Sequence, residues 1–132
     1  MESIEGNKLI VKMQIDLAKK GINKAALIKG LQELRPFALE EKDPTLTKVI
    51  RLTYEHIENN GTFNIPIPAD EEIADDLGDD NHEEVAHLIV NTIETDKDRV
   101  ESLNYLLSLM LGRTNSSNRE EMYVYRDALK EY

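Results

Sequence analysis

The 132-residue sequence contains no cysteine and no tryptophan. The absence of cysteine excludes disulfide cross-links, thiolate zinc sites and thiol nucleophiles, and it is consistent with a reducing compartment. No apolar run approaches the ~18 residues that a membrane-spanning helix needs, and the N-terminal residues do not follow the basic-then-apolar pattern of a signal peptide. We therefore expect a cytoplasmic protein that does not bind membranes.

Aromatic residues are also scarce, with two Phe and five Tyr in the whole chain. The core must therefore be built from Leu, Ile and Val. The six glycines never come closer together than nine residues, so the chain has no glycine-rich phosphate loop. No serine or other nucleophile lies beside any of the three histidines. We assign no catalytic residue and no cofactor, and we expect no enzymatic activity.

Basic residues are outnumbered, because 26 Asp and Glu face 16 Lys and Arg, which gives a net charge of −10. The excess lies in the second half: residues 1–66 carry a net charge of +1 and residues 67–132 a net charge of −11. Such a field repels nucleic acid phosphates and anionic membranes and attracts basic partners. We therefore expect no nucleic acid partner.

The apolar residues recur with helical spacing almost throughout the chain. This spacing predicts an all-α fold: a compact bundle of six or seven helices with one short extended proline-containing segment, forming a single domain over residues 1–132. The helices are expected at about residues 7–20, 23–35, 44–61, 69–77, 81–93, 96–112 and 117–132.

Capping residues and helix breakers set the expected boundaries. Gly21 and Gly61 are predicted to end helices, and Pro36 to kink or end the second helix. The expected N-caps are Asn23, Asp43, Asn81, Asp96 and Ser117.

Aromatic and histidine side chains are assigned structural roles. We expect His56 to pack at the edge of the third helix. Tyr125 and Tyr132 share the apolar stripe of the last helix, which predicts that both lie in the core, while Tyr123 faces elsewhere.

Residues 62–68 interrupt the helical pattern. Phe63, Ile65 and Ile67 alternate as in a strand, but Pro66 and Pro68 cannot donate to a β-ladder. An extended segment that lies across the helices is the simplest interpretation, and a docking edge for a partner is the alternative.

Nine of the fifteen residues from Asp70 to Glu84 are acidic and none is basic. Carboxylates in the first turn of a helix are stabilised by the helix dipole, so a solvated acidic face needs no function. The alternative is a surface for a protein partner. Its candidate residues are Asp75, Asp76, Asp79, Asp80, Glu83 and Glu84.

A metal site in the same region is a further alternative. Glu84 and His87 have the Glu-x-x-His spacing of carboxylate-bridged di-iron helices, although the sequence supplies no second pair. His82 and His87 are five residues apart, which places them about 140° apart around a helix, so they cannot share one metal on one face.

The first predicted helix has two apolar faces. The arc of Leu9, Ile10, Met13 and Leu17 is one of them, and the other is formed by Val11, Ile15, Ala18 and Ile22. A surface helix of a monomer needs one apolar face, so the second must contact other helices, a second copy in a homodimer, or a different protein.

These observations favour a non-catalytic protein–protein interaction module. One alternative is an acidic inhibitor or immunity-type protein that masks a basic partner. An alternative of a different class is a carboxylate/histidine metal-dependent enzyme that uses Glu84 and His87.

Overall fold

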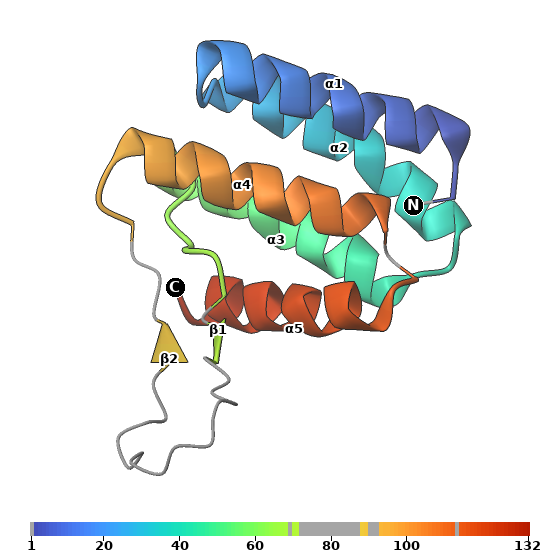
Figure 1. Ribbon diagram of the computed structural model, residues 1–132. Coiled ribbons are helices and arrows are strands. Elements are labelled where there is room, and N and C mark those ends of the chain that lie inside the picture. Colours follow the sequence, from blue (N-terminus) through green and yellow to red (C-terminus); the bar gives the residue numbers. More distant parts are fainter. Residues whose placement is uncertain (1, 69, 72–87, 90–92, 113) are drawn as a thin grey trace, which may run out of the picture.

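The computed structural model describes residues 2–68, 70–71, 88–89, 93–112 and 114–132. These residues form five α-helices and two strands of two residues each (Figure 1). The all-α class is confirmed. The helices are α1 (Ile4–Lys20), α2 (Lys24–Glu40), α3 (Pro44–Asn60), α4 (Asp96–Leu111) and α5 (Ser116–Glu131), and the strands are β1 (Asp70–Glu71) and β2 (Leu88–Ile89).

The five helices pack in a closed ring. Each helix contacts two others, in the spatial order α1, α2, α3, α5, α4 and back to α1 (Figure 1). The side chains that point into the ring are mainly aliphatic, as the composition predicts, and they make one continuous core. Its largest fully buried members include Ile10, Leu17, Leu31, Leu34, Leu46, Ile50, Ile57, Phe63, Leu103, Leu106, Leu107 and Tyr125.

The boundaries of α2 and α3 follow from local capping. The side chain of Asn23 accepts a hydrogen bond from the amide of Ala26, and that of Asp43 accepts one from the amide of Leu46. Gly61 ends α3 in the left-handed conformation that glycine adopts without steric cost. The predicted N-caps Asn23 and Asp43 and the predicted helix end at Gly61 are confirmed.

Three other boundaries differ from the predicted ones. Helix α1 begins at Ile4, because Ser3 caps it by accepting from the Gly6 amide. Helix α4 is capped by Thr95 rather than Asp96, since the Thr95 side chain and the Asp98 carboxylate bond reciprocally to each other's backbone amides. Helix α5 is capped by Asn115 rather than Ser117.

Pro36 neither ends nor interrupts α2, which continues to Glu40. Leu34 and Ala38, on either side of it, are both fully buried in the core. Their burial outweighs the backbone hydrogen bond that Pro36 cannot make, so the predicted helix end at this residue is wrong, while the alternative of a kink there stays a prediction.

The predicted count of six or seven helices is not met within the described part of the chain. Asp70 and Glu71 were expected in one helix and Leu88 and Ile89 in another, but these residues pair as antiparallel strands, with Asp70 opposite Ile89. Pro66 and Pro68 favour an extended conformation in the residues before them, which does not lead into a helix. The remaining residues of those two predicted helices lie outside the described ranges, apart from Ile93, which is not helical.

Residues 62–68 lie across the helices as an extended segment, as predicted, with Phe63 and Ile65 buried. Asn64 fixes this segment to α3, to α4 and to the residue that follows α5. Its backbone amide donates to Nε2 of His56 in α3, at 3.0 Å. Its side chain accepts from Nε of Arg99 in α4, at 3.0 Å, and donates to the hydroxyl of Tyr132, at 3.1 Å.

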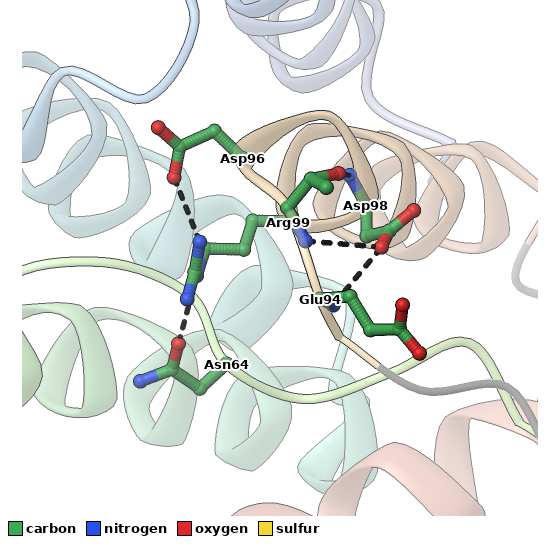
Figure 2. A network of polar contacts seen from close by, with 6 residues as sticks. Asn64, Glu94, Asp96, Asp98 and Arg99 are labelled. Carbon is green, nitrogen blue, oxygen red and sulfur yellow. Dashed lines mark hydrogen bonds and ion pairs between the residues drawn. The ribbon is translucent and has the colours of Figure 1, made fainter.

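Arg99 also belongs to the polar network that begins α4 (Figure 2). Its guanidinium contacts Asp96 at 2.7 Å, while the Asp98 carboxylate accepts from the amides of Glu94 and Thr95. These two backbone hydrogen bonds are the largest cause of the lowered pKa of Asp98. The 62–68 segment is therefore hydrogen-bonded to the first turn of α4 through Asn64 and Arg99.

A partly buried ion pair joins the N-termini of α3 and α5. Asp43, which is 5% exposed, accepts from Arg119 at 2.7 Å while also capping α3.

Among the described residues, no helix combines the length and the apolar character required to cross a bilayer.

Candidate functional site

The outer face of α1 exposes three large apolar side chains. Ile4 is 71% exposed, Val11 42% and Ile15 49%. The opposite face of the same helix carries Ile10 and Leu17 into the core. The two apolar faces predicted for this helix are therefore distinct, and the second is uncovered within the described residues.

The exposed residues form one straight stripe because of their spacing. Ile4, Lys8, Val11, Ile15 and Ala18 follow each other at alternating intervals of four and three residues. At 100° per residue they fall within an arc of about 80°. We call these five residues the α1 stripe. Alternating steps of three and four are the heptad pattern of helices that pair side by side.

The α1 stripe has a shallow hollow along its length. An open cavity of about 510 Å³ is lined by Ile4, Val11 and Ile15 together with Lys8, Lys12 and Asp16. The lysines can lay their methylene chains along the apolar side chains while their ammonium groups stay in water. The surface is therefore apolar along its middle and charged at its edges, like the core and rim of a protein interface.

This exposure decides between the alternatives for the second face. Residues of a helix enclosed by other helices would be buried, whereas Val11, Ile15 and Ala18 are exposed. Among the described residues, no helix therefore encloses this face of α1. Ile22 differs from the other three predicted residues, because it follows the end of α1 and packs, half-buried, against the core.

His56 has a structural environment. It is 6% exposed, and its ring meets Phe63 and Tyr132 edge-on. Because Nε2 accepts from the Asn64 amide, the neutral ring is the form that fits, and burial lowers the pKa of His56. The predicted packing role is consistent with this environment.

The tyrosines separate into buried and exposed positions. Tyr125 is fully buried, its hydroxyl lies 3.0 Å from that of Ser102, and burial raises its pKa.

Tyr132 is 63% exposed, so its predicted core position is wrong. Helix α5 ends at Glu131, and the ring of Tyr132 meets that of His56 edge-on while its hydroxyl accepts from the Asn64 side chain. Tyr123 faces solvent in part, as predicted, beside the guanidinium of Arg126.

The predicted acidic partner surface lies outside the described residues, and so does the predicted metal pair of Glu84 and His87. Within the described ranges, no three His, Cys, Asp or Glu side chains come together in a way that could hold a metal ion. The acidic surface is made up of Asp75, Asp76, Asp79, Asp80, Glu83 and Glu84.

Sequence reasoning did not include Ile4 and Lys8 in the second face. The predicted helix began near residue 7, which placed Ile4 outside it, and Lys8 is not an apolar residue. The heptad spacing that runs from residue 4 to residue 18 was the signal that could have identified both.

Comparisons with models of protein families, with curated proteins and with solved structures find no match to this chain.

Proposed function

We propose that this protein is a non-catalytic protein-interaction domain, and that the α1 stripe pairs it with a second copy of itself. The observation that supports the proposal is the exposed apolar line of Ile4, Val11 and Ile15 on a helix whose other face is already buried. A stripe of this kind is costly to leave in water and is typical of an interaction surface.

The α1 stripe is complementary to itself when two copies lie antiparallel. With a two-fold axis at the level of residue 13, Ile15 of one copy meets Val11 of the other, and Lys8 meets the small side chain of Ala18. The seam then has apolar contacts at its centre and a long side chain facing a small one on each side. In a parallel pair, the two Lys8 side chains would instead face each other, and like charges would repel.

The charges beside the α1 stripe also favour the antiparallel pair. Glu5, Lys12 and Lys19 lie at seven-residue intervals along one flank of the helix. Two-fold symmetry places this flank of one copy beside the same flank of the other copy. Glu5 of each copy then lies near Lys19 of the other, twice in the dimer, while the two Lys12 side chains repel once.

The proposal predicts that Ile15→Glu converts a dimer into a folded monomer. A glutamate at the centre of the seam would bury an unpaired charge in the dimer, but it lies at an exposed position in each subunit. Light scattering on a sizing column measures the mass, and circular dichroism measures the fold. Because three large apolar side chains make a small interface, the dimer should dissociate on dilution.

Val124→Glu is the matched control, because Val124 on α5 is also 49% exposed. This variant should keep the wild-type mass. A wild-type protein that is monomeric at all accessible concentrations contradicts the proposal, as does an Ile15→Glu variant that remains dimeric.

Cysteine cross-linking tests the orientation, since the chain has no cysteine of its own. Oxidation should join a Val11→Cys subunit to an Ile15→Cys subunit, because these positions face each other in the antiparallel pair. If Val11→Cys subunits cross-link to each other, and no cross-link forms between a Val11→Cys and an Ile15→Cys subunit, the pair is parallel.

A further inference from the structure

A second surface lies at the turn between α2 and α3, at the end of the ring where the N-terminus of the chain also lies (Figure 1). An open groove of about 500 Å³ is lined there by four cationic side chains. They are Arg35 from α2, Lys42 from the turn, and Lys48 and Arg51 from α3. This gathering of positive charge stands out in a chain whose net charge is −10.

The cations of this groove, which we call the basic groove, are incompletely neutralised. Asp43 is the carboxylate in its lining, and it already accepts from Arg119 and from the Leu46 amide. The Nε atoms of Arg35 and Arg51 are buried and donate no hydrogen bond within the described residues. Arg51 forms an ion pair with Glu55, although the 4.0 Å between Nε and the carboxylate oxygen is too long for a hydrogen bond.

Lys42 occupies a position where glycine would be more stable. It is the one non-glycine residue with a positive φ, 57°, among the described residues. Its amide donates to the Leu39 carbonyl and the Asp43 amide donates to that of Ala38, which is the Schellman motif. That motif favours glycine, and the lysine found here at the rim of the basic groove is therefore in a strained backbone conformation.

The lining also has an apolar component. Leu39, which belongs to α2, is 53% exposed at the edge of the basic groove. The lining contains no aromatic side chain on which a nucleic acid base could stack. The positive end of α3 is not open to a phosphate, because Asp43 already caps it.

We infer that the basic groove binds a short acidic peptide segment of a partner protein, with an apolar side chain of that segment placed on Leu39. Charge complementarity selects carboxylates, and Leu39 selects an apolar neighbour. A short segment matches the size of the basic groove, because its four cations all surround one hollow.

The test uses a fluorescein-labelled peptide of eight residues, all Asp or Glu except one central Leu. Fluorescence anisotropy should show saturable binding to the wild-type chain, with a dissociation constant on the order of 100 µM at low salt. Binding should weaken as salt is added. Peptides in which Ser replaces the Leu, or Gln replaces the acids, should each bind more weakly.

Two variants locate the binding. Lys42→Glu with Lys48→Glu should weaken binding about tenfold or more, because two attractive charges become repulsive. The matched control is Lys24→Glu with Lys29→Glu, which changes the net charge equally at the opposite end of α2 and should bind like the wild type. Lys42→Gly separates binding from folding, because it should raise the melting temperature and still weaken binding.

Several results would overturn the inference: no saturable binding, equal losses in both double variants, or displacement of the peptide by millimolar inorganic phosphate. Tighter binding of a single-stranded oligonucleotide at the same lysines would do so as well. The α1 stripe is tested separately, since the Ile15→Glu variant should keep full peptide binding.

Discussion

Lys42 has an unusual backbone conformation, with a positive φ angle. A left-handed conformation costs a lysine about 1–3 kcal/mol, because its Cβ approaches the following carbonyl. Glycine has no Cβ and pays no such penalty, although it gains more freedom in the unfolded chain.

We therefore expect Lys42→Gly to increase the free energy of unfolding by about 1 kcal/mol, as measured by urea denaturation. Gly61→Ala is the converse control. Gly61 has a φ of 78° and open space where a Cβ would be, so its replacement should lower stability through the backbone alone. Unchanged or reduced stability in the Lys42→Gly variant would mean that the lysine side chain itself stabilises the turn.

His56 makes stability depend on pH. Burial lowers its pKa in the folded state below the ordinary value of 6.5, and its ring must be neutral to accept from Asn64. The unfolded state therefore binds more protons below about pH 6.5. The contribution of His56 is fully present above that pH and is lost as the pH falls toward the folded-state pKa.

Unfolding by urea at several pH values between 7.5 and 5.5 should show this loss, with a slope of at most about 1.4 kcal/mol per pH unit from one proton. His56→Gln can supply a neutral acceptor that does not titrate, so its stability should fall less over the same interval. Parallel curves for the two proteins would exclude His56 as the cause.

At the level of whole elements, α2 contains a stability defect. Pro36 lacks the amide that would donate to the Gln32 carbonyl one turn earlier, and it is exposed on the helix surface. We expect Pro36→Ala to stabilise the protein by about 1–3 kcal/mol, less a few tenths for the freer unfolded chain.

Chemical denaturation measures this gain. Pro44→Ala should give none, because Pro44 stands in the first turn of α3, where no helical hydrogen bond is lost. A destabilised Pro36→Ala variant would show that the ring of the proline packs against a neighbour.

The elements that could be predicted from the sequence are those with local causes. Asn23 and Asp43 bond to amides three residues away, so neighbouring residues alone determine these helix starts. The helix end at Pro36 was wrongly predicted because the burial of Leu34 and Ala38, which keeps the helix going, depends on residues far away in the sequence. Periodicity identified Val11 and Ile15 as a second face, but their exposure depends on where the other helices pack.

The basic groove was not predicted for the same reason. Arg35, Lys42 and Arg51 are spread over 17 residues of the sequence, and the turn between α2 and α3 brings them around one hollow. The count of basic residues in the first half indicated an excess without locating it. Only the packing of the two helices creates the site.

For the whole molecule, the order of helices around the ring has a consequence for folding. The chain passes through α1, α2 and α3 as successive neighbours, but α4 then contacts α1, and α5 joins α3 to α4. Three neighbouring helices can associate early through short loops, yet their inner apolar faces remain open to water until the last 37 residues arrive. The rate-limiting step should therefore be the docking of α4 and α5 together, and a chain interrupted before that step would expose its core and tend to aggregate.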